Sequence, residues 1–272
     1  MIRLAAFDLD QTIVSDGLTI SPRVKEAIAK AQAQGVIITL ATGRGPTAAA
    51  KFATELDLQA PLICFQGALI YDHLAQRILH EVRLDPAMIP IIVRLADERG
   101  WNLEFHNPGM IYFPREMKDT PEYRRLLGTT NWKQVDNFLT DLPETPYKFI
   151  ISVREPGDRA VLDAELHAYF DPMPDKISIV ASHPLLVEGL PYGINKAVGL
   201  AWVADYLKIP STDVMAVGDN DNDVEMLAWA GVGVAMSNGS PAALAAADIT
   251  VPPVSEDGAA MALERFVLRS DD

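Results

Sequence analysis

Two carboxylates stand one residue apart near the N-terminus, at the end of an apolar run. Asp8 and Asp10 both lie in the segment AAFDLDQT. Residues i and i+2 of a strand point to the same side of a sheet, so the two side chains can serve one small volume. Burial disfavours ionised carboxylates unless positive charge compensates them. The pair therefore predicts a cation, or a cationic side chain, contributed by another part of the chain.

Three other segments carry residue types that could share this site. Two of them follow strand-like runs, and the third opens a helical segment. Open α/β sheets bind their ligands outside the carboxyl ends of the strands, so we expect the segments to meet at one edge of a sheet. The residues concerned are Thr42, Gly43 and Arg44 in ATGR, Asp219, Asn222 and Asp223 in GDNDND, and Lys196 in PYGINKAVGL.

The carboxylates at this edge predict a divalent cation. Asp219 would stand beside Asp8 and Asp10 if their strands are neighbours. Hard divalent cations prefer oxygen ligands, and an incomplete set of carboxylates completed by water suits Mg²⁺ better than a closed calcium site. We therefore expect Mg²⁺ as the cofactor.

A metal alone does not account for Thr42, Arg44 and Lys196. A hydroxyl, exposed backbone N–H groups and an ammonium are what a phosphoryl group needs opposite Mg²⁺. The two N-terminal carboxylates can then have separate tasks. One can attack phosphorus and form an aspartyl-phosphate, and the other can protonate the leaving oxygen and later deprotonate the attacking water.

The elements that must position these residues alternate between strand and helix in both outer thirds of the chain. This βαβαβ order predicts a parallel, doubly wound sheet, so the expected fold class is α/β with a Rossmann-like core. Predicted strands cover residues 2–9, 36–42, 61–67, 213–219 and 231–236, and predicted helices cover 21–35, 46–56, 195–207, 223–230, 240–247 and 256–269.

The middle of the chain differs in being richer in proline and aromatic residues. Its strand candidates are amphipathic and lie at 101–106, 110–114, 147–153 and 177–182, around helical segments at 86–100 and 157–170. Fewer, amphipathic strands between two βα-rich halves predict an inserted α+β domain. We expect a core of residues 1–82 and 188–272 and an inserted domain of residues 83–187.

The composition narrows the possible partners. The formal net charge of the 272 residues is −14 and the sequence pI is about 4.7. Such a chain is unsuited to nucleic acid, which is bound mainly through Lys and Arg, and an anionic membrane surface would repel it. We see no signal peptide and no apolar run of the roughly 20 residues that span a bilayer. The single cysteine, Cys64, is expected to be a core residue, and the chain to be cytoplasmic.

Taken together, DLDQT, TGR, Lys196 and GDNDND resemble the motifs of the haloacid dehalogenase superfamily of phosphatases. The large insertion resembles that of its Cof-like branch, type IIB, which carries an α/β C2 cap. VAMSNGSP and SEDGAAMAL look like the C-terminal signature of that branch, with Asn238 near the site entrance. The resemblance implies a Mg²⁺-dependent phosphomonoesterase for a small phosphorylated metabolite, either a sugar phosphate or a phosphorylated cofactor, with the cap determining substrate specificity.

The resemblance also implies roles for matching residues. Asp8 would be the nucleophile, and Asp10 the general acid/base that also binds Mg²⁺ through its backbone carbonyl. Thr42 and Lys196 would be catalytic groups that hold the phosphoryl group. The substrate-binding residues would be Thr42, Gly43, Arg44, Lys196 and Asn222, and the metal-binding residues Asp8, Asp10, Asp219 and Asp223.

The sequence departs from the pattern of this family at three positions. Gln11 stands where the family usually has glycine, and glycine permits backbone geometries that cost other residues about 1 kcal/mol or more. Gln11 is therefore expected to affect the rate and the placement of Asp10. FQGA replaces the usual SNGA, so Gln66 can alter what lies under the cap. Ser237 replaces a glycine and is expected to matter little.

The sequence argues against several other classes of protein. The five histidines lack zinc-site spacing, and no serine-hydrolase elbow or P-loop is present. A receiver domain would lack GDNDND and need no cap. A phosphosugar mutase of the same branch and a non-catalytic sugar-phosphate sensor remain open, as do the substrate and the oligomeric state. In the middle domain, Trp101, Tyr112, Phe113 and Tyr147 are expected in the core, and His106 and Arg115 are weaker candidates for substrate contact.

Overall fold

The computed structural model describes residues 1–15, 18–114, 131–153, 155–173, 175–183 and 185–268. Their contacts divide the chain into two compact units. The first unit comprises residues 1–43, 49–80 and 195 onward, and the second comprises residues 44–48 and 81–194. The inserted segment expected from the sequence ended at 187, inside a strand, whereas the second unit continues to Ile194.

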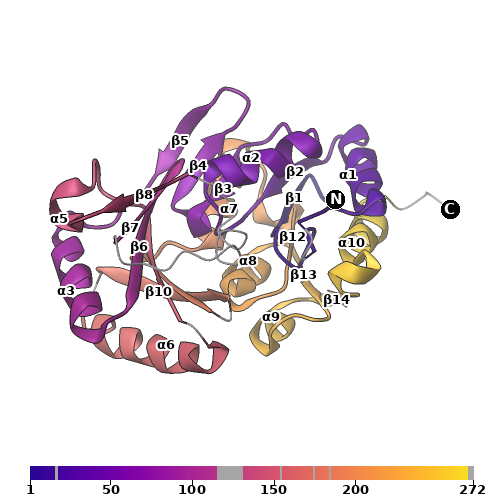
Figure 1. The fold of residues 1–272 in the computed structure, drawn as a ribbon. Coiled ribbons are helices and arrows are strands. Elements are labelled where there is room, and N and C mark those ends of the chain that lie inside the picture. The colour runs from indigo at the N-terminus through magenta and orange to yellow at the C-terminus, as the bar shows by residue number, and fades with distance from the viewer. Residues whose placement is uncertain (16–17, 115–130, 154, 174, 184, 269–272) are drawn as a thin grey trace. The chain divides into compact units, whose positions relative to one another are not determined.

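A parallel five-stranded sheet forms the centre of the first unit, in the order β14-β13-β12-β1-β2 (Figure 1). Every neighbouring pair in it is parallel, as the βαβαβ pattern predicted. All four residues of β1 and all five of β12 are buried, as expected for strands covered on both faces. The strands are β1 (Leu4–Phe7), β2 (Ile37–Leu40), β12 (Val214–Gly218), β13 (Val232–Met236) and β14 (Ile249–Val251).

Helices cover both faces of this sheet. α1 (Pro22–Ala33) and α10 (Gly258–Phe266) pack together on one face, and α7 (Lys196–Tyr206), α8 (Val224–Trp229) and α9 (Pro241–Ala246) follow one another on the other (Figure 1). α1 shows how residues close in the sequence determine where a helix begins and which side of it is buried. The Ser21 side chain caps it by accepting a hydrogen bond from the N–H of Val24, and its buried face is Val24, Ala27, Ile28 and Ala31. The doubly wound core is therefore confirmed.

The strand expected at 61–67 is shorter than predicted and lies in a sheet of its own. β3 (Leu62–Cys64), β4 (Leu69–Asp72) and β5 (Arg77–Glu81) form a three-stranded sheet, which a single bridge between Ala41 and Ile63 joins to the end of β2. Cys64 is fully buried there, and burial raises the pKa of its thiol well above the ordinary value. The cysteine is a core residue, as expected. The segment between β2 and β3 contains α2 (Pro46–Glu55).

The second unit is an α+β domain built on a six-stranded sheet in the order β10-β11-β9-β6-β7-β8. The pairs are antiparallel except for β7 and β8. Its helices α3 (Ile89–Arg99), α5 (Phe138–Asp141) and α6 (Pro156–Phe170) share one apolar core with the sheet. The strands are β6 (Asn102–Asn107), β7 (Met110–Pro114), β8 (Trp132–Val135), β9 (Lys148–Ser152), β10 (Ile177–His183) and β11 (Leu186–Pro191). The aromatic residues Tyr112, Phe113 and Tyr147 are buried, as expected.

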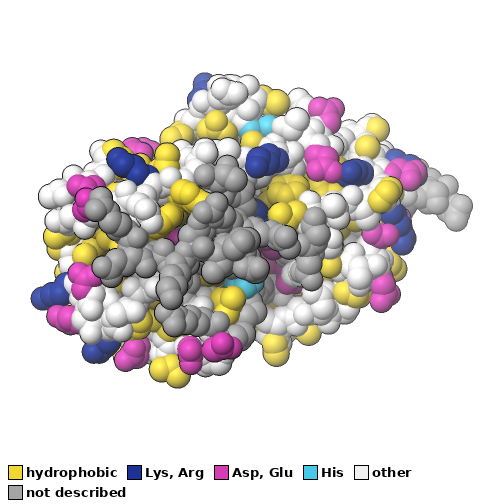
Figure 2. Space-filling model, in the orientation of Figure 1, with side chains coloured by type: hydrophobic (Ala, Val, Ile, Leu, Met, Phe, Trp, Pro, Cys, Tyr) yellow, Lys and Arg dark blue, Asp and Glu magenta, His cyan; other side chains and the backbone are white. Residues whose placement is uncertain are grey.

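The surface agrees with the acidic composition. On the face that Figure 2 shows, the coloured Lys and Arg side chains are scattered among Asp and Glu and form no continuous basic surface. Within the described part of the chain, no helix combines the length and the apolar character needed to cross a membrane.

Candidate active site

The ends of β1 and β12 bring two of the predicted carboxylates side by side. The strands are neighbours, with Phe7 paired to Val217. Asp8 follows the first strand directly and Asp219 comes just after the second, and the Asp8 N–H donates to the Val217 carbonyl at 2.9 Å. The expectation that DLDQT and GDNDND meet at one edge of the sheet therefore agrees with the geometry.

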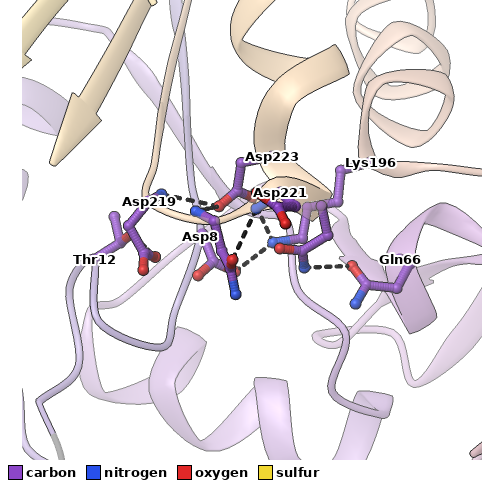
Figure 3. Close-up of polar contacts among 9 residues, drawn as sticks. Asp8, Thr12, Gln66, Lys196, Asp219, Asp221 and Asp223 are labelled. Carbon is purple, nitrogen blue, oxygen red and sulfur yellow. Dashed lines mark hydrogen bonds and ion pairs between the residues drawn. The ribbon is translucent and has the colours of Figure 1, made fainter. Parts of the chain in front are cut away.

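Lys196 is the first residue of α7, and its side chain reaches the carboxylates. The Asn195 side chain caps this helix by accepting a hydrogen bond from the N–H of Val198 at 3.0 Å. The Lys196 side chain is 1% exposed, and its Nζ lies 2.6 Å from Oδ1 of Asp8 and 2.6 Å from Oδ1 of Asp223 (Figure 3). One ammonium therefore bridges two buried carboxylates that are 215 positions apart in the chain.

Asp223 also shapes the loop that carries Asp219. Its Oδ2 accepts hydrogen bonds from the N–H groups of Asp219 and Asn220, at 2.9 and 3.0 Å. A Cβ on Gly218 would lie 2.5 Å from Cγ of Asp223, so this turn requires glycine at that position. Both oxygens of Asp223 thus already accept hydrogen bonds, and a cation would have to share one of them.

Thr12, which DLDQT places at the same strand end as Asp8 and Asp10, makes a contact that the sequence did not reveal. It is 1% exposed, and its Oγ1 donates to Oδ1 of Asp219 at 2.9 Å. The Ser240 N–H donates to the backbone carbonyl of Asp219 at 2.8 Å, so the loop after β13 also supports this residue. Thr12 in DLDQT was visible in the sequence, but nothing in the pattern showed that its hydroxyl faces an aspartate 207 residues away.

The charges of this cluster are not balanced. Ligand oxygens of Asp8, Asp219 and Asp223 all lie within 4.8 Å of one another, and Lys196 supplies one positive charge among them. Burial raises the pKa of Asp8 well above its ordinary value, and the nearby carboxylates add to this rise against the effect of Lys196. Burial, followed by the charge of Asp223, raises the pKa of Asp219 to about 7.

Lys196 remains charged in this environment. Burial alone would lower the pKa of its ammonium, but the charges of Asp223 and Asp8 outweigh burial and raise the pKa above the ordinary value. Three carboxylates and one ammonium leave an excess of negative charge in a buried place. A hard divalent cation would relieve that excess through oxygen ligands, so the residues fit a divalent metal.

Two glutamines of the site adopt left-handed backbone conformations. Gln11 has φ 61°, which shows that the chain needs at this position the conformation that glycine adopts most readily. Its N–H donates to the Val14 carbonyl at 2.9 Å, and Asp10, beside it, is exposed. Gln66 has φ 58° and is 1% exposed, and its Oε1 accepts a hydrogen bond from Nδ2 of Asn222 at 3.0 Å.

The predicted phosphate-binding segment, Thr42, Gly43 and Arg44, begins two residues after the end of β2. Thr42 is buried just beyond β2, where its N–H donates to Ile63 and its carbonyl accepts from Gln66. Gly43 follows it, and Arg44 belongs by its contacts to the second unit. The roles of these three in phosphate binding stay predictions. Arg115 lies outside the described residues.

The comparisons with known proteins agree with this geometry. The sequence profile described as haloacid dehalogenase-like hydrolase matches residues 5–263. The chain belongs to this family. It is 30% identical to the 5-amino-6-(5-phospho-D-ribitylamino)uracil phosphatase YitU of Bacillus subtilis, over 97% of each chain. It is 28% identical to the pyridoxal phosphate phosphatase YbhA of Escherichia coli, over 95% of this chain and 96% of that one.

A solved structure extends the likeness to the fold. A haloacid dehalogenase-like hydrolase from Bacteroides thetaiotaomicron superimposes with a TM-score of 0.85 at 26% identity, covering 98% of this chain and 100% of that one. The resemblance seen in the motifs is thus confirmed, and this haloacid dehalogenase-like protein is an enzyme of the phosphatase class.

Proposed function

We propose that this protein is a Mg²⁺-dependent phosphomonoesterase that works through an aspartyl-phosphate on Asp8. The buried cluster of Asp8, Asp219 and Asp223 around Lys196 is the observation that carries the proposal. It combines a nucleophile, an excess of negative charge suited to a divalent cation, and a fixed ammonium. We assign Mg²⁺ to Asp8, the backbone carbonyl of Asp10, Asp219 and Asp223.

When bound, Mg²⁺ would supply positive charge that keeps the Asp8 carboxylate ionised and stabilises the charge developing on the phosphoryl oxygens. The side chains of the chain itself provide the remaining chemistry. Lys196 is held 2.6 Å from Asp8, so its ammonium also favours the ionised form and neutralises a phosphoryl group arriving at the nucleophile. Thr42, Gly43, Arg44 and Asn222 are assigned to hold the other phosphoryl oxygens.

The first displacement transfers the phosphoryl group to the enzyme. An oxygen of Asp8 attacks phosphorus, the bond from phosphorus to the ester oxygen breaks, and Asp10 donates a proton to the departing alcohol. In the second displacement Asp10 takes a proton from water, which attacks phosphorus. Phosphate then leaves and the Asp8 carboxylate is restored. Asp10 is exposed whereas Asp8 is 6% exposed, which suits a group that exchanges protons with water beside a shielded nucleophile.

The substrate class proposed is a small phosphorylated metabolite. The names of the two relatives describe phosphatases of a ribityl-substituted uracil phosphate and of pyridoxal phosphate. Both compounds are compact monoesters whose carbon part carries hydrogen-bonding groups. We assign recognition of that part to the second unit, as the substrate-specificity domain.

The test is phosphate release from a panel of such monoesters and from a plain aryl phosphate, with Mg²⁺ or with a chelator. Asp8→Asn should abolish release, a loss on the order of 10⁴-fold or more, because the carboxamide is a poor nucleophile. Asp221→Asn is the matched control, since Asp221 is an exposed carboxylate of the same loop outside the cluster. It should retain activity near the wild-type level.

Two results would redirect the proposal. Conversion of a hexose 1-phosphate to the 6-phosphate without net phosphate release would identify a mutase. Binding of a sugar phosphate with Mg²⁺, but no turnover of any compound, would identify a sensor. Metal-independent hydrolysis, or full activity of Asp8→Asn, would refute the mechanism.

A further inference from the structure

β5 is an edge strand of the sheet that it forms with β3 and β4. The two strands β4 and β5 form a hairpin, and no strand within the described part of the chain pairs with the other side of β5 (Figure 1). An edge strand presents backbone N–H and C=O groups with which a further strand can pair. Proteins commonly protect such edges with lysine or proline, whereas the middle of β5 is Ile78, Leu79 and His80. This edge is therefore suited to the addition of a strand.

The solvent side of α7 carries a row of apolar side chains. Val198 and Tyr206 are 42% and 48% exposed, and Trp202 lies between them, four residues from each, on the same side of the helix. The opposite side, which includes Leu200 and Val203, is buried in the apolar core. A surface helix normally has polar residues toward solvent, so apolar side chains on both sides of α7 are typical of a helix that is covered on both.

The edge strand and the row on α7 are in contact. The ring of His80 stacks on that of Trp202, with 5.5 Å between centroids and 14° between planes, and Trp202 stacks in turn on Tyr206 at 5.4 Å. Ile78 is 41% exposed and shares one side of β5 with His80, because successive side chains of a strand alternate. We call these residues the β5–α7 surface: Ile78, His80, Val198, Trp202 and Tyr206. Contiguous exposed apolar side chains of this kind mark surfaces of interaction.

The sequence of β5, RILHE, is complementary to itself in charge. When two copies of β5 pair antiparallel about a twofold axis at Leu79, Arg77 of each copy lies opposite Glu81 of the other. Ile78 then lies opposite His80, and Leu79 opposite the same residue of the second copy. Opposite charges that face each other across strands stabilise the pairing, whereas like charges destabilise it. Of the registers with twofold symmetry, only the one centred on Leu79 pairs all five residues of the strand.

We propose that the β5–α7 surface binds the same surface of a second copy of this chain. The two copies form a twofold dimer in which their three-stranded sheets join through β5 into one sheet of six strands. Arg77 and Glu81 are exposed, so exchanging their present surface contacts for pairs across the twofold axis costs little. Neither these residues nor the β5–α7 surface belongs to the cluster around Lys196, so the inference does not depend on the proposed function.

The first experiment compares two matched substitutions in the full-length chain. Ile78→Lys places a charge in the proposed interface, whereas Val161→Lys places the same charge on α6, where Val161 is 65% exposed. Sedimentation velocity over a range of protein concentrations should show a monomer–dimer equilibrium for the wild type. Ile78→Lys should raise the Kd of the dimer about 100-fold or more, and Val161→Lys should leave it within about twofold of wild type.

The second experiment tests the register by charge reversal. Arg77→Glu brings glutamates face to face at both ends of the paired strands, and Glu81→Arg brings arginines face to face there. Each variant alone should dimerise about 10- to 100-fold more weakly than wild type. An equimolar mixture of the two variants should dimerise about as strongly as wild type, because every end pair of the mixed dimer again joins a glutamate to an arginine.

The results that would overturn the inference are distinct. A wild type that stays monomeric at its highest soluble concentration would leave the β5–α7 surface to a different occupant. A dimer that Ile78→Lys does not weaken would place the interface elsewhere on the molecule. A mixture that dimerises no better than its two components would overturn the proposed strand pairing. Circular dichroism checks that each variant is folded, and if Ile78→Lys is not, the two charge-reversed variants carry the test.

Discussion

Replacing Lys196 by methionine tests the electrostatic balance of the site most directly. The substitution keeps the length of the side chain but removes an ammonium that lies 2.6 Å from both Asp8 and Asp223. All three side chains are at most 9% exposed, so the two carboxylates would lose their shared partner without gaining water. Breaking a buried ion pair by removing one partner costs about 3–5 kcal/mol.

We therefore expect Lys196→Met to lower the free energy of unfolding by about 3–5 kcal/mol in the presence of a chelator, a large share of the total stability of a domain. Phosphatase activity should also fall by about 10²- to 10³-fold, because positive charge is lost where negative charge develops on the phosphoryl group. A divalent cation should restore more stability to the variant than it adds to the wild type, since it meets a larger uncompensated charge.

Equilibrium unfolding in urea, followed by circular dichroism with and without Mg²⁺, measures these changes. Lys208→Met is the matched control, because the Lys208 side chain is 79% exposed and its pair with Asp205 is at the surface. That variant should lose less than about 0.5 kcal/mol. The double variant Lys196→Met with Asp223→Asn removes one stranded charge, so it should recover part of the lost stability without recovering activity.

The reasoning would be refuted if Lys196→Met cost no more stability than Lys208→Met in chelator. A double variant less stable than the single one would equally show that Asp223 is not the stranded partner, because removing its charge would then have removed only hydrogen bonds to the loop.

Two other predictions concern the same edge of the sheet. Gln11→Gly should raise the free energy of unfolding by about 1 kcal/mol, because Gln11 has φ 61°, a backbone conformation that glycine adopts without strain. The control Gln34→Gly should bring no gain, because Gln34 has φ −86°. Equal effects of the two substitutions in urea unfolding would contradict this reasoning. The pKa of Asp219 is raised by burial from its ordinary value of 3.8 to about 7. Between these values the folded metal-free protein holds a proton that the unfolded chain has lost, so stability falls as pH rises from about 4 to 7. Asp219→Asn should remove this contribution, and a stability difference between wild type and variant that stays constant with pH would refute it.

The sequence determined the α/β fold class and much of the core. Continuous apolar runs such as Leu4–Phe7 predicted strands buried on both faces, and the Ser21 cap with helical spacing from Val24 to Ala31 predicted α1 and its buried side. These signals are local, since they depend on residue types within one element. The same local logic placed Asp8, Asp219 and Lys196 at element ends, where an open α/β sheet places ligands.

Local patterns were weaker where pairing with distant residues decides the structure. β3 is short and lies with β4 and β5 instead of extending the main sheet, and β8 and β11 of the second unit were not expected. Gln11 and Gln66 show the same limit for the backbone, since glutamine gives no sign of the positive φ that both positions adopt.

Only the tertiary structure decided which polar groups meet. The bond from Thr12 to Asp219 joins residues 207 positions apart, and the bridge of Lys196 brings together Asp8 and Asp223, which are 215 positions apart. In the second unit, the buried side chains of Glu104, His106, Lys148 and Glu188 likewise come together through the register of three strands. Spacing along the chain shows which side of a strand a residue faces. The bonding partners of a side chain and its removal from water follow from tertiary packing instead. Partners and burial together determine the charge balance of the site, on which its chemistry depends.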